Sequence, residues 1–122
     1  NKISNVKVWG TGKPKREFLY VDDMARACIH VMNLDKKIYE KKTNLMCSHI
    51  NIGTGKDLTI KEIAKIIKDV VGYKGKIIFD SSKPDGSPRK LLRINRISSF
   101  GWKPKMNLRD GLINTYKAFL KN

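Results

Sequence analysis

The chain has 122 residues, the length of one ordinary domain. No apolar stretch approaches the roughly 20 residues that a membrane helix requires, so we expect no membrane partner. Its 26 lysines and arginines against 11 acidic residues give a formal net charge of +15, which favours phosphorylated or polyanionic partners. The basic residues form no run interleaved with aromatics, and no zinc-finger or RNA-binding signature occurs, so nucleic acid is the weaker alternative.

The amino-terminal part predicts two extended runs followed by a helix. Val6–Trp9 is a short β-like run that ends in the turn signal Gly10–Gly12. Phe18–Val21 predicts a second extended run. Asp22 and Asp23 then offer N-caps and negative charge for the first turn of a helix. The first residue is Asn1 and the apolar run follows almost at once, so we expect the chain to begin inside a longer one.

The spacing of apolar residues predicts which side of this first helix is buried. They recur at steps of three and four residues, at Val21, Met24, Ala25, Cys28, Val31 and Met32. Cys28 would then be an inert core thiol, and His30, on the opposite side, would be solvated rather than a ligand. Only two cysteines are present, which favours a reducing cytoplasm, with a Cys28–Cys47 bridge as the alternative.

The middle of the chain predicts a loop, a strand and a well-capped helix. Asp35–Ser48 is rich in lysine and has no periodicity, so it is predicted to be a loop. His49–Ile52 predicts a strand. Thr59 and Glu62 have the spacing of a capping box at the start of an amphipathic helix, and Gly72 ends it.

The last third predicts another strand and two more helices. Lys76–Phe79 is a short strand, and Ser82–Arg89, with two prolines and a glycine, is a loop. A short helix is expected near Asn95–Phe100, and Asn107 is expected to cap a final helix. Short strands alternating with amphipathic helices, without an internal repeat, predict one α/β domain over residues 1–122.

The chain contains no complete catalytic or cofactor-binding motif. Gly-Thr-Gly-Lys occurs at 10–13 and at 53–56, but Pro14 and Asp57 stand where a phosphate-binding P-loop needs Ser or Thr. Neither string has the third glycine of a dinucleotide fingerprint. No Tyr-x-x-x-Lys pair, nucleophile elbow or metal-binding helix is present. We therefore expect no catalytic, cofactor-binding or metal-binding residue within this chain.

Binding residues are instead expected beside the glycine- and proline-rich loops, where function concentrates. The candidates there are Trp9, Arg16, Arg89 and Lys90. The planar guanidinium of Arg16 suits bidentate contact with a phosphate, which a lysine does not match. The alternative for Arg16 is a surface ion pair with Glu17 or Asp22.

Four strings of the sequence resemble one enzyme family. They are Val8–Ala25 (VWGTGKPKREFLYVDDMA), His49–Gly55 (HINIGTG), Val71–Gly75 (VGYKG) and Phe79–Leu92 (FDSSKPDGSPRKLL). Together they resemble the GDP-L-fucose synthases, a branch of the extended short-chain dehydrogenase/reductases. The Lys-Pro-Asp-Gly-x-Pro-Arg-Lys string is the most specific of them, and the resemblance runs from about Val8 to the end.

The resemblance implies a fold and a reaction. The chain would be the carboxy-terminal third of its parent, a small mixed α/β substrate-binding domain without the Rossmann domain. The parent would epimerise GDP-4-keto-6-deoxy-mannose at two ring carbons and then reduce it with NADPH. The NADP site and the catalytic residues would precede this chain, and the parent would be a cytoplasmic homodimer. A related enzyme acting on another nucleotide-sugar is the alternative.

The resemblance also implies four substrate-binding residues. Arg16 matches the contact to the nucleotide diphosphate, and Trp9 matches a wall beside the nucleotide-sugar. Lys90 matches a second cationic contact, and Lys76 falls where the family has a basic one. Arg93 departs from the pattern, because an acidic residue is usual there, which leaves the fine substrate specificity open.

Overall fold

The computed structural model describes residues 4–121 and has a mixed α/β fold, which confirms the predicted class. Its helices are α1 (Val21–Met32), α2 (Lys36–Lys42), α3 (Ile60–Val71), α4 (Asn95–Ser99) and α5 (Leu108–Phe119). Its strands are β1 (Asn5–Trp9), β2 (Lys15–Glu17), β3 (Asp57–Thr59), β4 (Lys76–Asp80) and β5 (Arg89–Lys90).

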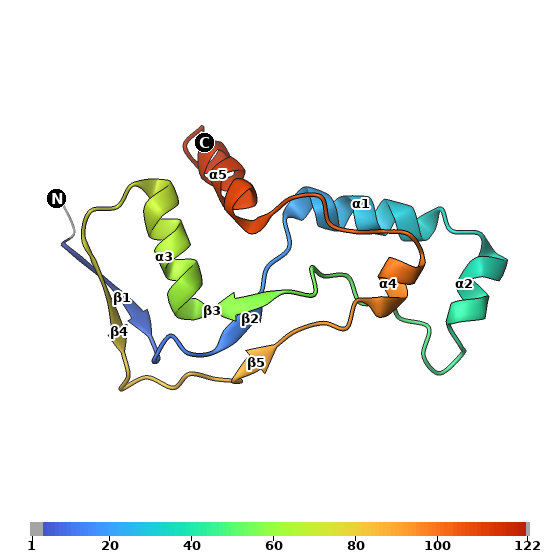
Figure 1. The fold of residues 1–122 in the computed structure, drawn as a ribbon, viewed down its shortest axis with the longest axis horizontal. Helices are drawn as coiled ribbons and strands as arrows, with labels where there is room; N and C mark the ends of the chain where they lie inside the picture. Colours follow the sequence, from blue (N-terminus) through green and yellow to red (C-terminus); the bar gives the residue numbers. More distant parts are fainter. Residues whose placement is uncertain (1–3, 122) are drawn as a thin grey trace.

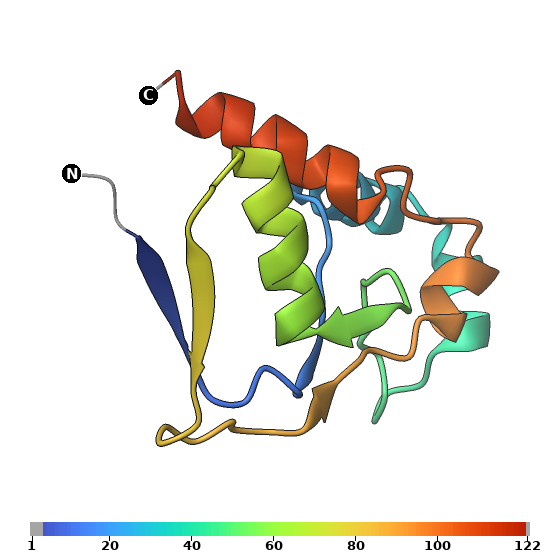
Figure 2. The ribbon, with the colours of Figure 1, turned by 60° about the vertical axis from the view of Figure 1, so that its left-hand side comes forward.

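The strands form two small sheets. β1 pairs with β4 in parallel, and the second sheet has the order β3-β2-β5, with β2 antiparallel to β3 and parallel to β5. Figures 1 and 2 show the β1–β4 ladder at one end of the molecule and α1, α2 and α4 at the other. Helix α3 leads from β3 to β4, and α5 packs beside it. The three-stranded sheet thus connects the ladder to the helical end.

The hydrophobic core is small and lies at the helical end. Its buried centre is formed by Ala27, Ile97 and Trp102. Half-buried apolar side chains surround this centre: Leu19, Val31, Ile50, Ile52 and Ile94. A core of this size can contribute only modest stability on its own.

Asp22 and Asp23 supply the predicted negative charge in the first turn of α1, but the prediction that they cap it is wrong, because the N-cap is Tyr20. The signals of α3 and α5 are confirmed. The amide of Glu62 donates to the Thr59 hydroxyl over 3.1 Å, and the Thr59 amide donates to the Glu62 carboxylate over 2.7 Å, which completes the capping box. Gly72 ends α3 in the left-handed conformation, with φ of 68°. The Asn107 side chain accepts a hydrogen bond from the Asp110 amide over 2.9 Å at the start of α5.

Two predicted extended runs are wrong. The strand near Phe18–Val21 lies earlier, at Lys15–Glu17, and α1 already begins at Val21. His49–Ile52 belongs to no strand of the described structure. Ile50 and Ile52 are half-buried against the core, so this alternating segment has an inner face but no neighbouring strand. A strand forms only where another strand completes its hydrogen bonds.

The loop predicted at Asp35–Ser48 is also wrong, because it contains α2. The Asp35 carboxylate caps this helix by accepting hydrogen bonds from the amides of Lys37 and Ile38, at 2.8 and 3.3 Å. The Tyr39 ring stacks on Phe100, with 6.3 Å between the centroids, and attaches the helix to the core. The N-cap residue was the available signal in the sequence.

The predicted buried side of α1 is exposed. Asp23 and Ala27 are the fully buried residues of the helix, whereas Cys28 is exposed and Met32 is 83% exposed. His30, predicted to be solvated, is half-buried, with Nε2 2.8 Å from the Phe100 carbonyl oxygen. The core therefore packs on the side of α1 opposite to its most continuous apolar stripe.

Replacing Gly12 with alanine should destabilise the fold more than the same change at Gly101. Both glycines have positive φ, at 75° and 86°, so an alanine at either position is strained in the left-handed conformation. A Cβ on Gly12 would also lie 2.5 Å from the Phe79 ring, whereas nothing lies within 4 Å of one on Gly101. We expect an additional loss of about 1–3 kcal/mol at Gly12. Equal urea midpoints for the two variants would contradict this packing argument.

Candidate functional site

Arg16 and Lys90 are neighbours in the structure although they are 74 positions apart in the sequence. They face each other in register across the parallel pair of β2 and β5. Register neighbours project from the same side of a sheet, so the guanidinium and the ammonium leave β2 and β5 in the same direction. Arg16 is half-buried and Lys90 is exposed. Two of the four predicted substrate residues thus form one cationic surface.

The positive charge of Arg16 is not neutralised by an ion pair within residues 4–121. Its Nη1 donates to the Lys15 carbonyl over 2.7 Å. The Glu17 carboxylate instead accepts hydrogen bonds from the amides of Gly55 and Leu92, at 2.6 and 3.0 Å. The alternative role for Arg16, a surface ion pair with Glu17 or Asp22, is therefore wrong. A free guanidinium is available for an anion.

Trp9 stands at the end of β1 that leads towards β2. It is 72% exposed, and the Lys83 ammonium lies 5.8 Å from its ring centroid. An exposed indole at a strand end is a flat apolar wall with a cation above it. The turn Gly10–Gly12 and the segment Pro14–Lys15 connect this wall to Arg16. A short segment of chain therefore joins Trp9 to Arg16, and Lys90 lies beside Arg16 across the sheet.

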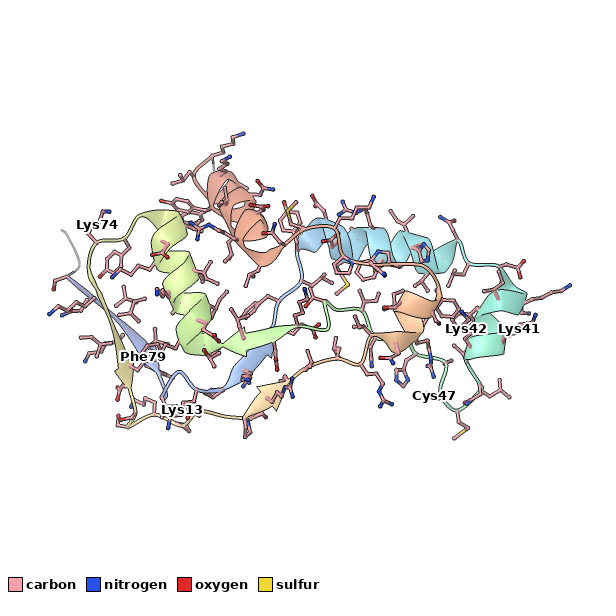
Figure 3. The ribbon with its side chains drawn as sticks, viewed as in Figure 1. Lys13, Lys41, Lys42, Cys47, Lys74 and Phe79 are labelled. Carbon is pink, nitrogen blue, oxygen red and sulfur yellow. The ribbon has the colours of Figure 1, made fainter. Side chains whose placement is uncertain are left out.

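Lys76 lies apart from these three residues. It pairs with Asn5 at the beginning of the β1–β4 ladder, whereas Trp9 pairs with Asp80 at the other end. Four residues of extended chain separate the two ends by about 13 Å. Figure 3 shows the same separation, with Lys74 at one end of the ladder and Lys13 and Phe79 towards the other.

Arg89 is occupied by an internal contact. Its Nε and Nη2 donate to the two carboxylate oxygens of Asp57, at 2.5 and 3.3 Å, which joins β5 to β3. The hydrogen bond from Arg89 holds the pKa of Asp57 below its usual range. Arg89, singled out in the sequence together with Trp9, Arg16 and Lys90, is thus the member of this set that forms a salt bridge within residues 4–121.

The acidic residues that hold the site together were missed by sequence reasoning. Glu17 fastens Gly55 and Leu92 to β2, and Asp85 fastens the loop after β4 to Thr11. No local spacing connects partners 38 to 75 positions apart. The only available signal was the presence of carboxylates next to glycine turns in a chain with few acidic residues.

Neither Gly-Thr-Gly turn can hold the pyrophosphate of a dinucleotide. A Cβ on Gly10 would overlap the Asp85 carboxylate, and one on Gly53 would lie 2.5 Å from the Glu17 carboxylate. The space beside each turn is thus filled by a negative charge, which repels a phosphate. The residues of this chain do not fit NADP at these turns.

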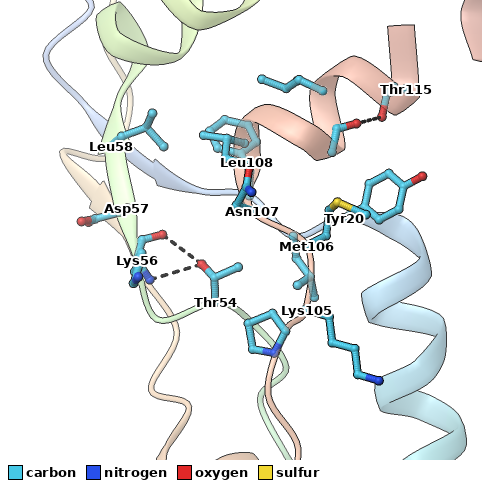
Figure 4. Close-up of a pocket in the computed structure, with 15 residues that line it drawn as sticks. Tyr20, Thr54, Lys56, Asp57, Leu58, Lys105, Met106, Asn107, Leu108 and Thr115 are labelled. Atoms are coloured by element: carbon cyan, nitrogen blue, oxygen red, sulfur yellow. Dashed lines mark hydrogen bonds between the residues drawn. The ribbon is translucent and has the colours of Figure 1, made fainter. Parts of the chain in front are cut away.

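The structure also contains an apolar cavity. It has a volume of about 550 Å³ and lies between the start of α5, the Phe18–Tyr20 segment and β3 (Figure 4). Its lining is mostly apolar and includes Leu58, Met106 and Leu108. None of the four predicted substrate residues lines it.

Two further findings concern residues 4–121. No three His, Cys, Asp or Glu side chains in this range are grouped so that they could hold a metal ion. None of its helices is long and apolar enough to cross a membrane.

The sequence and the structure both match known nucleotide-sugar enzymes. Residues 1–53 match the profile of the NAD dependent epimerase/dehydratase family. The chain is 55% identical over 118 residues to the GDP-L-fucose synthase of Escherichia coli (strain K12), covering 97% of this chain and 37% of that protein. It superposes with a TM-score of 0.88 and 41% identity on a GDP-6-OMe-4-keto-L-xylo-heptose reductase from C. jejuni, covering 97% of this chain and 34% of that one. It also superposes with a TM-score of 0.85 and 40% identity on a GDP-D-glycero-L-gluco-heptose synthase from Campylobacter jejuni, crystallised in the presence of NADPH. This match covers 96% of this chain and 33% of that one.

Residues 1–53 thus resemble the NAD dependent epimerase/dehydratase family. Within it, the identity to the Escherichia coli GDP-L-fucose synthase confirms the resemblance seen in the four sequence strings. The chain spans only about a third of the length of these relatives.

Proposed function

We propose that the chain is the substrate-binding portion of an NADP-dependent epimerase/reductase that makes GDP-L-fucose. The observation that carries the proposal is the unpaired Arg16 guanidinium beside Lys90, on a path that leads to the exposed Trp9. In this role Arg16 and Lys90 bind the diphosphate of the GDP-sugar. Trp9 forms a wall against the nucleotide-sugar. Lys76 contacts the ligand only if the ligand extends along the β1–β4 ladder.

The chemistry in this proposal belongs to the remaining two-thirds of a parent chain. That part binds NADP and supplies the groups that move protons and hydride. This chain holds the GDP-sugar still, so that its ring carbons stay at the reacting groups. Charged contacts to the diphosphate provide binding energy remote from the reacting carbons, which the enzyme can use to orient the sugar. We also expect the parent to be a homodimer, as predicted from the resemblance.

The chain exposes more surface than a compact protein of its mass, which supports the proposal that a partner covers part of it. The chain exposes 9357 Å² at a mass of 14.0 kDa. A compact monomer of this mass exposes about 6700 Å². The excess, about 2,700 Å², is of the size that a permanent interface covers. We propose that the NADP-binding portion of the parent covers it.

Helix α1 presents the clearest part of this surface. Its exposed side carries an apolar stripe, named here the α1 stripe, made of Val21, Met24, Ala25, Cys28 and Met32. The opposite side of α1 is already buried at Asp23 and Ala27. An apolar stripe left exposed on a helix that is already packed on its other side is typical of a surface that a partner covers. The unpaired segment His49–Ile52 is a second part of the interface, because another strand could complete its hydrogen bonds.

Mixing the chain with the other two-thirds of the Escherichia coli relative should restore activity and bury Cys28. The chain alone should show no NADPH oxidation with GDP-4-keto-6-deoxy-mannose above a buffer control, because its glycine turns do not fit the cofactor. In the mixture we expect turnover, together with slower reaction of Cys28 with a maleimide, measured in a Cys47→Ser background.

Two variants make this experiment selective. Met32→Glu places a charge on the α1 stripe and should prevent both the turnover and the protection of Cys28. Lys37→Glu, on the exposed surface of α2, should affect neither. Turnover by the chain alone would overturn the division of labour, and turnover without protection of Cys28 would remove the α1 stripe from the interface.

A related GDP-sugar is the second candidate substrate. A GDP-L-colitose synthase from Yersinia pseudotuberculosis is 39% identical over 117 residues, and the two superposed structures are named for GDP-heptoses. These relatives are all named for GDP-sugars and differ in the sugar. Comparing kcat/KM of the reconstituted enzyme for GDP-4-keto-6-deoxy-mannose and for a GDP-4-keto-heptose decides between them.

A further inference from the structure

One carboxylate joins the turn after β1 to the loop after β4. Asp85 accepts a hydrogen bond from the Thr11 amide over 2.6 Å and another from the Thr11 hydroxyl over 2.7 Å. Each carboxylate oxygen thus takes one donor of the same residue. The partners lie 74 positions apart, so the contact fixes two segments that the sequence leaves independent. This pair is named here the Asp85–Thr11 contact.

The turn after Trp9 is shaped to receive this carboxylate. Gly10 has φ of 86°, and a Cβ there would overlap a carboxylate oxygen of Asp85. The Gly10 amide donates to the Asp80 carbonyl over 2.9 Å and continues the β1–β4 ladder beyond Trp9. Glycine is therefore needed here both for its backbone conformation and for the close approach of the carboxylate.

The loop held by Asp85 reaches from Trp9 to Arg16. At one end, the Lys83 ammonium lies 5.8 Å from the Trp9 ring centroid. At the other end, Gly86 lies close to the Arg16 guanidinium, because a Cβ added to Gly86 would be 4.0 Å from Nη2. Beyond it, the Lys15 amide donates to the Pro88 carbonyl over 2.8 Å. Asp85 is the residue between these two ends whose side chain fastens the loop to the neighbouring turn.

We propose that Asp85 is a positioning residue of the nucleotide-sugar site, which holds Trp9 and Arg16 at a fixed separation before the ligand arrives. The proposal rests on the proposed function. A carboxylate repels phosphate, so Asp85 acts through the residues that it orders and does not itself bind the diphosphate. Ordering the loop in advance removes a cost that ligand binding would otherwise bear.

The charge of Asp85 is maintained by its partners. Hydrogen bonds from the Thr11 hydroxyl and amide hold the pKa of Asp85 below its usual range, and Lys13 lowers it further. The carboxylate therefore stays ionised, and the contact stays intact, throughout the pH range in which free aspartate is ionised. Asparagine at this position keeps one acceptor oxygen but loses the charge and the second acceptor.

The first measurement needs no ligand. Compared with the wild-type chain, Asp85→Asn should shift the indole N–H resonance of Trp9 and increase the quenching of Trp9 fluorescence by acrylamide. The Trp9→Phe variant assigns both signals. Thr11→Val, which removes only the hydroxyl, should cause a smaller change of the same kind. Asp69→Asn on the exposed side of α3 changes the net charge equally and should leave Trp9 unaltered. An unchanged Trp9 signal in Asp85→Asn would overturn the proposal.

The second measurement is the affinity for GDP, at a temperature where circular dichroism shows all variants to be folded. Asp85→Asn should weaken GDP binding about five- to fiftyfold, which lies within the range of coupling between contacting residues. Adding Thr11→Val to Asp85→Asn should weaken binding little further. Asp69→Asn should bind GDP like the wild type. Equal GDP affinity in Asp85→Asn and wild type would overturn the positioning role, and a wild-type chain that binds no GDP would overturn the proposed function itself.

Discussion

Replacing Arg16 with lysine in the reconstituted enzyme should raise the Michaelis constant for the GDP-sugar several-fold, although the charge is kept. A guanidinium can donate two parallel hydrogen bonds to phosphate oxygens, whereas an ammonium acts as a point charge. Arg16→Ala removes the whole contact, which is worth about 1.5–3 kcal/mol, so the increase should reach roughly ten- to a hundredfold. Stability should change little, because Arg16 has no ion pair within residues 4–121.

The matched control for this prediction is Arg109 on α5, which is exposed and lies outside the proposed site. Arg109→Lys and Arg109→Ala should leave both the Michaelis constant and the melting temperature near the wild-type values. Steady-state kinetics and thermal unfolding of the four variants test the assignment together. A Michaelis constant unchanged in Arg16→Ala would remove Arg16 from the site.

Replacing Asp23 with alanine should cause the largest loss of stability in the chain. Asp23 is 0% exposed, and its carboxylate accepts hydrogen bonds from Arg26 and from the amides of Lys105 and Met106. Alanine leaves two backbone donors without this acceptor and the Arg26 charge without its partner. We expect a loss of about 3 kcal/mol and a melting temperature lower by roughly 10 °C.

Asp22, the exposed neighbour in the same helix, provides the control. Asp22→Ala should cost about 0.5 kcal/mol or less. Asp23→Asn should fall between the two, because it keeps one acceptor oxygen. Chemical denaturation of all three variants measures the differences, and similar losses for Asp22→Ala and Asp23→Ala would contradict the structural role of this carboxylate.

The pH dependence of stability offers a second measurement on Asp23. Burial would raise the pKa of this carboxyl, but the Lys105 and Met106 amides and Arg26 together hold it below the usual aspartate range. A depressed pKa in the folded state stabilises the protein above the unfolded pKa, and this contribution is lost as the pH falls through the folded value. Asp23→Asn should lack this acid-dependent loss.

The features read correctly from the sequence depend on neighbouring residues. The capping box of Thr59 and Glu62, the left-handed Gly72 and the Asn107 cap each join groups at most three positions apart, or need one backbone conformation. The missed helix α2 has the same kind of signal at Asp35, which was hidden by the surrounding lysines. The candidates Trp9, Arg16 and Lys90 came from their place beside loops and from the resemblance, Lys76 came from the resemblance alone, and their roles stay predictions.

The sequence by itself determined the caps of α3 and α5, the glycine turns, the mixed α/β class and the family resemblance, because these follow from local chemistry and from continuous strings. Only the tertiary structure decided which side of α1 is buried, since the apolar stripe predicted the opposite side and the core packs on Asp23 and Ala27 instead. It also decided that Arg16 and Lys90 are register neighbours and that Glu17 is engaged elsewhere. These contacts join residues 38 to 74 positions apart, and whether such segments meet depends on the packing of the whole chain.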